Sequence, residues 1–173
     1  QWSYTQGLQF ITALVAHGGE TAVDHALTVL PVSTEQIIHP ERNPNHKPTP
    51  VDVPDIGPKL GRGWTDLDVE GIGEEWLSLA LALRLPGSDA ASAAAGWDGG
   101  ISRAWSDGTH VAVVLSTVWD TAPDAAEFAS AMNRWIDAGN GQAAEVLPPE
   151  GSSVRVLFAS DASTLSDLEA ATA

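Results

Sequence analysis

The sequence predicts an α+β protein that combines a helical N-terminal part with a small antiparallel sheet. Three observations lead to this fold class. Apolar residues recur at helical spacing near the start of the chain, two strand-like runs meet at Asp107-Gly108, and a helical run and a strand-like run follow them. Helices that precede a compact β-β-α-β group, without regular βα alternation, indicate this class rather than a parallel sheet.

Two helices are predicted at the beginning of the chain. Residues 4–17 and 20–30 each repeat apolar residues three or four positions apart, and Gly18-Gly19 separates the two runs. Pro31 ends the second run, because proline lacks the amide hydrogen that would continue a helix. Two short helices joined by a glycine pair predict an αα-hairpin.

Proline dominates the next stretch, since residues 40–58 contain six of the eleven prolines. Such a stretch is neither a helix nor a central strand, and we expect an extended surface crossover that is tethered where Val51, Val53 and Ile56 can dock. The predicted organisation is a helical subdomain over 1–39, a Pro-rich crossover over 40–60, an α+β subdomain over 61–160 and a frayed tail over 161–173.

A β-hairpin over residues 101–119 is the element that the rest of the α+β part must cover. An Asp-Gly pair between strands is typical of a two-residue type I′ turn. That turn predicts Ser106 opposite Thr109 and Trp105 opposite His110. Both faces of the second strand are apolar, which predicts a central strand covered on both sides.

The other elements follow from spacing and end signals. A strand is expected near 64–69, helices over 74–85, 89–95 and 122–138, a loop over 139–151 and a last strand over 153–159. Six of the seven tryptophans fall at positions that we expect to be core. They are Trp64, Trp76, Trp97, Trp105, Trp119 and Trp135.

Composition excludes several classes of function. The net charge of −15 opposes binding to nucleic acid or to an anionic membrane surface, both of which need basic residues. Without cysteine there is no disulfide framework and no thiolate metal site. No apolar run is long enough to span a bilayer. Because the chain begins at Gln1 rather than Met, we expect a trimmed or mature piece of a longer protein.

Three residues beside the Pro-rich stretch are candidates for a metal site. His39, Glu41 and His46, with Glu35 one helical turn before His39, could supply nitrogen and oxygen ligands to zinc if the loop folded back. Their spacing matches no closed zinc pattern, and histidine before proline is common in surface loops. The ordinary interpretation, a surface loop, is therefore favoured.

Three further groups have both a chemical and a structural interpretation. Ser106, Asp107 and His110 crowd one turn, but turn chemistry accounts for the first two, and no nucleophile elbow precedes them. The alternating acids Asp66, Asp68 and Glu70 suit either a calcium site or a solvated strand face. The glycine-rich run 96–100 enters a strand rather than a helix, which favours a turn over a phosphate loop.

Four segments together resemble a known family. Tyr4–Phe10, Pro31–Glu41, Gly96–Gly99 and Thr117–Asp120 are similar in sequence and order to the C-terminal half of uncharacterised secreted or lipoprotein-type proteins of high-GC bacteria related to gluzincin-like zinc metallopeptidases. In those proteins the zinc-binding H-E-x-x-H helix lies upstream. This sequence contains no H-E-x-x-H, so the resemblance carries over no catalytic residue and no cofactor.

The resemblance implies a non-catalytic accessory domain, extracellular or in the cell envelope, that packs against an upstream domain of the same parent chain. The apolar Trp2 and Tyr4 at the start of the first helix are expected to belong to that interface. Two alternatives remain open. A free-standing envelope domain that binds a small ligand or peptide requires an apolar pocket, expected near the Pro-rich stretch. A self-contained hydrolase requires a nucleophile, a base and an orienting group within hydrogen-bond reach.

Overall fold

The computed structural model describes residues 2–42, 45–141 and 143–173, with the side chains of all but residues 2–4. The chain divides into two compact units, residues 1–48 and residues 49–173, and each is described by itself. The boundary falls inside the predicted Pro-rich crossover. No helix in the described ranges is long and apolar enough to cross a bilayer.

The N-terminal unit consists of helices around a very small core. Helix α1 (Trp2–Thr28) is bent at Gly19, whose φ of 64° and ψ of −157° interrupt the helical backbone, so the two predicted helices are confirmed as two arms of one kinked element. Helix α2 (Glu35–Ile38) and the 3₁₀ turn η1 (Pro40–Arg42) follow it. The buried apolar residues of this unit are Phe10, Leu14 and Ala26.

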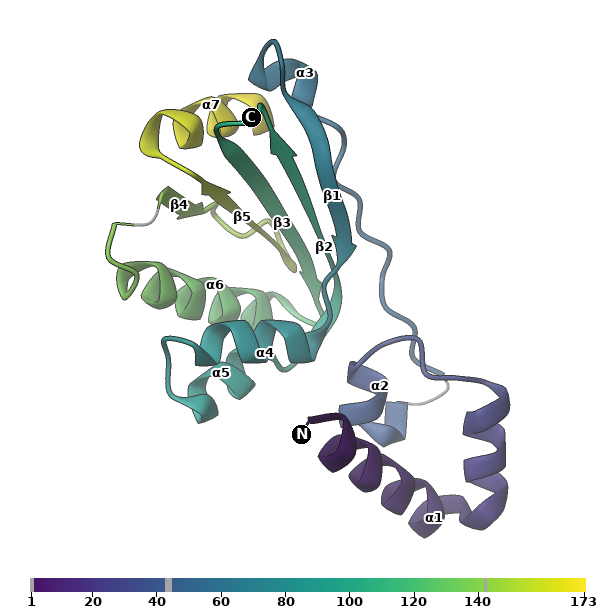
Figure 1. Cartoon of the computed structure of the whole chain (residues 1–173). Coiled ribbons are helices and arrows are strands. Elements are labelled where there is room, and N and C mark those ends of the chain that lie inside the picture. Colours follow the sequence, from purple (N-terminus) through teal and green to yellow (C-terminus); the bar gives the residue numbers. More distant parts are fainter. Residues whose placement is uncertain (1, 43–44, 142) are drawn as a thin grey trace. The chain divides into compact units, whose positions relative to one another are not determined.

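The C-terminal unit is built on one antiparallel sheet, which confirms the predicted α+β class (Figure 1). The strands are ordered β1-β2-β3-β5-β4. Their bounds are β1 Thr65–Gly71, β2 Trp97–Ser106, β3 Val111–Trp119, β4 Ala143–Val146 and β5 Ser153–Ala159. Strand β3 is central, as its apolar residues on both faces predict.

Helices cover both faces of the sheet. Helices α4, α5 and α6 enclose one core with the indole of Trp119, which stacks on Phe128 with ring centroids 4.6 Å apart. Helices α3 and α7 enclose a second core around Trp105. The helices are α3 Gly57–Leu60, α4 Glu74–Ala82, α5 Gly87–Ala94, α6 Ala122–Asp137 and α7 Ala162–Thr172.

The predicted hairpin is present, but its register was wrong by two residues. Ser106 pairs with Val111 rather than with Thr109, and Trp105 pairs with Ala112. The turn is wider because Asp107 Oδ1 accepts hydrogen bonds from the amides of both Thr109, at 2.8 Å, and His110, at 2.7 Å. A shift of two residues preserves the side-chain alternation, so the two predicted faces of the hairpin are retained.

Two expectations about the C-terminal part were wrong. The loop predicted over 139–151 contains strand β4, a short edge strand without β-branched residues until Val146; Gln142 lies outside the described residues. The predicted frayed tail is helix α7. Asp161 caps it by accepting a hydrogen bond from the Thr164 amide at 2.9 Å, and Leu168 is fully buried against the sheet.

The Pro-rich stretch agrees with the prediction over most of its length. Residues 46–56 have no regular structure, and Val53 and Ile56 are buried in the second core. Arg103 fastens the segment to the sheet by donating to the Val53 carbonyl at 3.0 Å. The helical turns at its two ends, η1 and α3, were not predicted. Residues 43 and 44 lie outside the described part of the chain.

Candidate functional site

The histidines proposed as metal ligands are engaged with different carboxylates. His39 Nδ1 lies 3.7 Å from Glu41 Oε1, whereas His46 Nδ1 lies 3.0 Å from Glu35 Oε2. The Glu35 side chain is almost fully buried, and its other oxygen pairs with Arg42. These contacts give Glu35 a structural role, because a buried carboxylate needs charged partners and here they hold the segment after α2 in place.

The adjacent Gln36 completes this polar cluster. Its amide group donates to the His46 carbonyl at 2.5 Å, and its Oε1 accepts from the Val32 amide at 2.7 Å. Gln36 and Glu35 therefore connect both chain segments that flank α2. The spacing of the residues in the sequence did not reveal this buried polar cluster.

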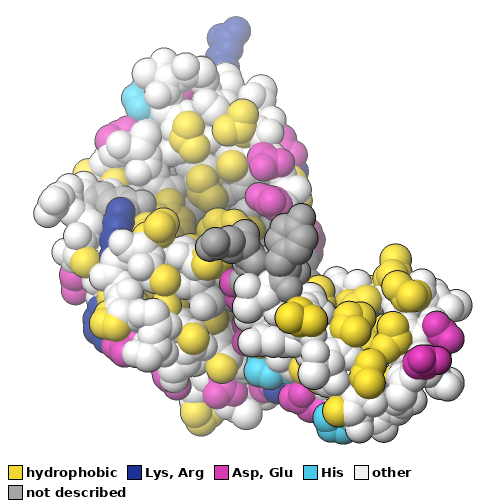
Figure 2. Space-filling view, turned by 60° about the horizontal axis from the view of Figure 1, so that its bottom comes forward, with side chains coloured by type: hydrophobic (Ala, Val, Ile, Leu, Met, Phe, Trp, Pro, Cys, Tyr) yellow, Lys and Arg dark blue, Asp and Glu magenta, His cyan; other side chains and the backbone are white. Residues whose placement is uncertain are grey.

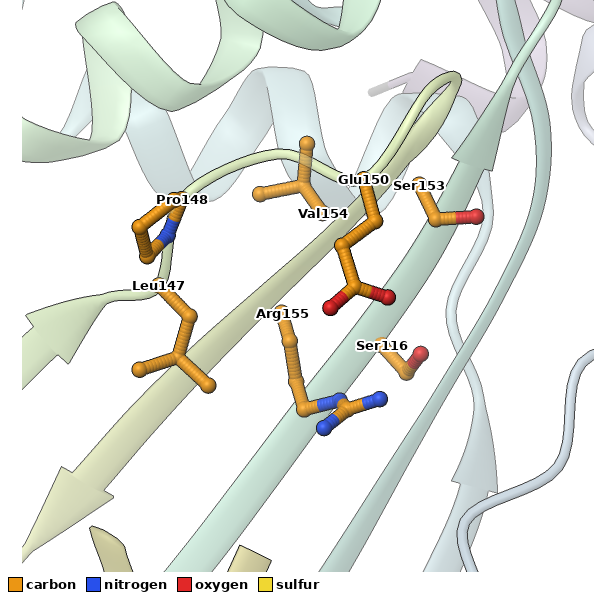
Figure 3. A pocket seen from close by; sticks show the side chains of 7 residues that line it. All are labelled: Ser116, Leu147, Pro148, Glu150, Ser153, Val154 and Arg155. Carbon is orange, nitrogen blue, oxygen red and sulfur yellow. The ribbon is translucent and has the colours of Figure 1, made fainter. Parts of the chain in front are cut away.

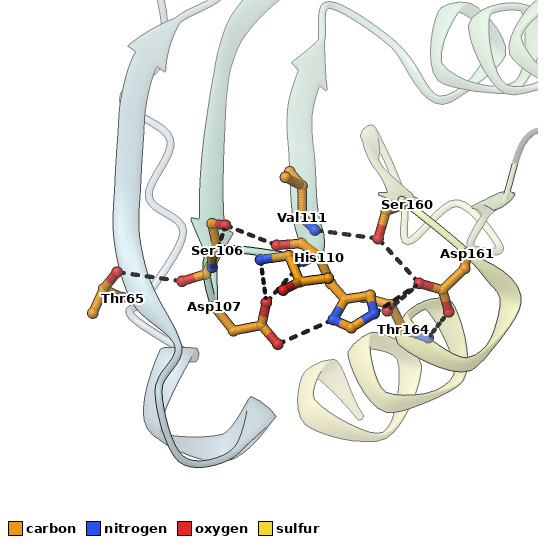
Figure 4. A network of polar contacts seen from close by, with 10 residues as sticks. Thr65, Ser106, Asp107, His110, Val111, Ser160, Asp161 and Thr164 are labelled. Carbon is orange, nitrogen blue, oxygen red and sulfur yellow. Dashed lines mark hydrogen bonds and ion pairs between the residues drawn. The ribbon is translucent and has the colours of Figure 1, made fainter.

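Ser106, Asp107 and His110 come together in the β2–β3 turn, but not as a catalytic relay (Figure 4). The Ser106 hydroxyl donates to the His110 backbone carbonyl at 2.8 Å rather than to the imidazole ring. His110 Nδ1 contacts Asp107 Oδ2 at 3.1 Å, and Nε2 lies 3.9 Å from Asp161 Oδ2. The ring thus bridges the hairpin turn and the cap of α7, and the serine is oriented away from a base.

Electrostatics around this turn follow from the same contacts. Hydrogen bonds from the His110 amide, the His110 ring and the Thr109 amide lower the pKa of Asp107 from 3.8 to about 2. The hydrogen bond with Asp107 raises the pKa of His110 above 6.5, with a smaller contribution from the charge of Asp161. Bonds from the Thr164 amide and hydroxyl lower the pKa of Asp161. The network favours charged groups that join α7 to the hairpin.

Hollows in the C-terminal unit differ in size and lining. One of about 40 Å³ lies where Glu150, Ser153 and Arg155 approach Ser116 (Figure 3), which is space for little more than water. Another of about 210 Å³ lies beside the Pro-rich segment, lined in part by Asp52, Val53, Ile56, Lys59 and Arg155. A pocket of about 320 Å³ lies between the sheet and helices α4 and α6.

Trp76 lines this last pocket and is the exception among the six tryptophans expected in the core. It is 49% exposed, whereas Trp97, Trp105 and Trp119 are buried. Its position on the helical pattern of α4 resembles that of a core residue, because Leu77 and Leu81 share the helix and are buried. Sequence spacing alone does not reveal that Trp76, together with Ala80 and Leu83, lines an open pocket.

The N-terminal unit exposes more large aliphatic side chains than it buries (Figure 2). Leu8 is 69% exposed, and Ile11 and Val15 follow it on the same face of α1 at spacings of three and four residues. The other exposed aliphatic residues are Leu27, Val29, Leu30 and Val32. The side chains of Trp2 and Tyr4, which we predicted to belong to this surface, lie outside the described residues.

A groove of about 370 Å³ marks the bend of α1. It is lined by Leu14, His17 and Ala22 from the two arms of the helix, and by Pro40 and Glu41 from η1. The unit thus combines an exposed apolar surface with a groove, and its first 34 residues contain only two charged side chains, Glu20 and Asp24. This combination is suited to contact with another protein surface.

Comparison with known proteins assigns the C-terminal unit to a family. No curated protein and no solved structure matches the chain. A family model described as a domain of unknown function, DUF8575, matches residues 65–169, from the first residue of β1 into α7. The match covers the whole sheet, helices α4, α5 and α6 and most of α7, and the chain therefore belongs to the DUF8575 family.

Proposed function

We propose that the chain is a non-catalytic accessory part of a larger protein and that residues 1–48 dock against a neighbouring domain of that protein. The observation that carries this proposal is the exposed aliphatic surface of the N-terminal unit, formed by Leu8, Ile11, Val15, Leu27, Val29, Leu30 and Val32. The resemblance to metallopeptidase-related proteins of the bacterial envelope supports a parent of that kind, in which the neighbouring domain lies upstream.

The small core of the N-terminal unit supports a permanent rather than a transient contact. Among the side chains that the structure describes in this 48-residue unit, three apolar ones are buried, Phe10, Leu14 and Ala26. Units of this size bury too little apolar surface to be stable alone unless disulfides, metals or partners contribute. The chain has no cysteine, so disulfides do not contribute. Burial of the exposed aliphatic side chains against a partner would supply the missing apolar contacts.

Charge distribution supports the same interpretation. The chain carries a net charge of −15, yet only Glu20 and Asp24 are charged in residues 1–34. Permanent interfaces are depleted of charged residues at their centres and resemble a protein core divided in two. The rest of the chain has an acidic surface that repels anionic partners. The surface of residues 1–34, in contrast, can be buried with few charged groups to desolvate.

One substitution tested in two contexts measures this docking. Leu8→Ser should change the free energy of unfolding of the 173-residue chain by less than about 0.5 kcal/mol, because the side chain is 69% exposed there. In the longer parent protein the same substitution should cost about 1.5–3 kcal/mol, because the side chain is buried in the interface. Denaturant midpoints of the four proteins give both values.

Gln9→Ser provides the matched control. Gln9 is the next residue on α1 and is exposed, but it is polar. Gln9→Ser should change the free energy of unfolding little in both proteins. Its effect measures the cost of the lower helix propensity of serine, which is then subtracted from the effect of Leu8→Ser. If Leu8→Ser is equally mild in the chain and in the parent, the surface is not buried by a neighbouring domain and the docking proposal is wrong.

A further inference from the structure

The pocket between the sheet and helices α4 and α6 is large enough to hold a small molecule. Its volume is about 320 Å³, at the lower end of the range of about 300–1,000 Å³ in which proteins hold small ligands. Helices α4 and α6 form its walls, and strands β2, β3 and β5 form its floor. The residues that define it are Trp76, Leu83, Val113, Leu115, Met132 and Phe158.

Its interior offers almost no polar group. Ser102 provides the only hydroxyl of the lining. The indole nitrogen of Trp135 already donates to the Ala80 carbonyl at 2.8 Å, so it is not available to a ligand. The part of a ligand that enters this pocket must therefore be apolar, because a polar group would lose its hydration without gaining a partner.

Acidic side chains flank the pocket on its β1 side. Glu70 is paired with Ser102, and Asp68 is paired with Ala104. Residues directly opposite each other in an antiparallel pair project from the same face, so both carboxylates lie on the pocket's face of the sheet. Figure 2 shows hydrophobic side chains of the C-terminal unit bordered on one side by acidic ones.

The rim residues add a second preference for positive charge. Trp76 is 49% exposed on the rim, and an exposed indole face attracts a cation, most strongly one without hydrogen-bond donors. Arg84, which follows the lining residue Leu83 in the chain, is already occupied. Its guanidinium lies 3.7 Å from the centre of the Trp135 ring and donates to the Trp135 carbonyl at 3.1 Å. The charged groups that a ligand would meet at the β1 side of the pocket are therefore the carboxylates of Asp68 and Glu70.

We propose that this pocket binds a small amphipathic cation, with an apolar body between α4, α6 and the sheet and an ammonium group beside Glu70, Asp68 and Trp76. This site is separate from the docking proposed for residues 1–48 and does not depend on it. It gives the DUF8575 unit a ligand-binding role and defines the chemistry of the ligand: one positive charge attached to a compact hydrocarbon group.

Three probes that share one hydrocarbon chain test the proposal. Octyltrimethylammonium, octanol and octyl sulfate are titrated below their aggregation concentrations into the full chain, with calorimetry and amide NMR as readouts. The cation should bind with one-to-one stoichiometry and about tenfold more tightly than octyl sulfate. Shifts should centre on the amides of Ser102 and Val113, which line the pocket.

Variants separate the roles of charge and cavity. Asp68→Asn combined with Glu70→Gln should weaken binding of the cation about 3- to 10-fold and leave octanol unchanged, because two exposed carboxylates are neutralised without loss of volume. Asp167→Asn, an exposed acid on α7 at the opposite face of the sheet, is the control and should have no effect. Ser102→Phe should fill the pocket and abolish binding of all three probes.

The outcomes that overturn the proposal are distinct. Equal affinity for the three probes, or unchanged affinity of the cation in the doubly neutralised variant, would show that the acids do not select the ligand. Shifts that centre on α1 rather than on β2 and β3 would show that the probe binds elsewhere. The two neutralising substitutions lie on an exposed edge strand, so the combined variant should fold and its binding result is interpretable.

Discussion

The indole nitrogen of Trp105 on β2 donates a hydrogen bond of 2.8 Å to Asp55 Oδ1 in the Pro-rich segment. The same oxygen accepts from the Gly57 amide at 2.9 Å, which places Asp55 at the start of α3. These bonds lower the pKa of Asp55, the Gly57 amide contributing most and the Trp105 indole next. One side chain thus fixes an extended segment across the second core.

Trp105→Phe should therefore release the Pro-rich segment as well as weaken the core. Trp105 is fully buried, so the loss of its hydrogen bond and part of its volume should reduce the free energy of unfolding by about 1–3 kcal/mol. Hydrogen exchange should accelerate in residues 56–60. Trp64→Phe makes the same chemical change at a half-buried position and should cost less; an equal loss in the two variants would contradict the tether.

The packing of α6 on the hairpin gives a second prediction. Phe128 is fully buried and Met132 nearly so, both against the sheet. Phe128→Ala or Met132→Ala should cost about 2–5 kcal/mol, measured by denaturant unfolding, because each leaves a cavity. Ser130→Ala, on the exposed side of the same helix, should stay within about 0.5 kcal/mol of the parent. If Phe128→Ala lowered the free energy of unfolding no more than this control, the face of α6 that carries Phe128 would not be buried.

Charge at the β2–β3 turn predicts a dependence of stability on pH. The pKa of His110 is raised in the folded state, so its contribution is fully present below about pH 6.5 and is lost as the pH rises through the folded pKa. The pKa of Asp107 is lowered to about 2, so its contribution is present above about pH 4 and is lost as the pH falls toward 2.

NMR titration of the His110 ring tests this assignment together with denaturant midpoints across pH. The folded pKa should exceed 6.5, and Asp107→Asn should lower it. His110→Asn should remove the part of the stability that declines above neutral pH. A ring pKa that does not change when Asp107 is replaced would contradict the pairing in Figure 4.

Much of the fold could be predicted because its signals are local. Thr121 caps α6 by accepting from the Asp124 amide at 3.3 Å, and the alternation of Val154 and Val156 marks β5. The errors arose where distant contacts decide. Strand β4 exists because β5 offers an edge, and α7 is ordered because Leu168 is buried on the sheet, although its own sequence is rich in serine, threonine and alanine.

The candidate sites were harder to predict, for a related reason. The sequence placed His39 and His46 near carboxylates, but only the folded chain shows that His46 contacts buried Glu35 while His39 contacts Glu41. Trp76 is exposed whereas its neighbour Leu77 on α4 is fully buried, and the apolar spacing of the helix did not distinguish the two positions. The apolar spacing of α1 predicted a helix, but it did not distinguish buried residues such as Phe10 from exposed ones such as Leu8.

The accessory role also predicts the absence of peptidase chemistry in this chain. The isolated protein should show no peptidase turnover after zinc addition and should retain no zinc through chelation, because the sequence lacks the histidine pair and glutamate of H-E-x-x-H. Metal analysis and a generic peptidase assay measure both. Stoichiometric zinc that survives chelation, or turnover abolished by His39→Ala or His46→Ala, would instead support a self-contained hydrolase.

Hydrogen exchange of α1, compared between the 173-residue chain and its longer parent, tests the docking of the N-terminal unit most directly. In the isolated chain, residues 5–28 should exchange rapidly, because Phe10, Leu14 and Ala26 are the only buried apolar residues among the described side chains of this unit. In the parent the same amides should be protected at least about tenfold more, while the central strand β3 should exchange alike in both proteins. Equal and rapid exchange of α1 in both would contradict the proposed docking.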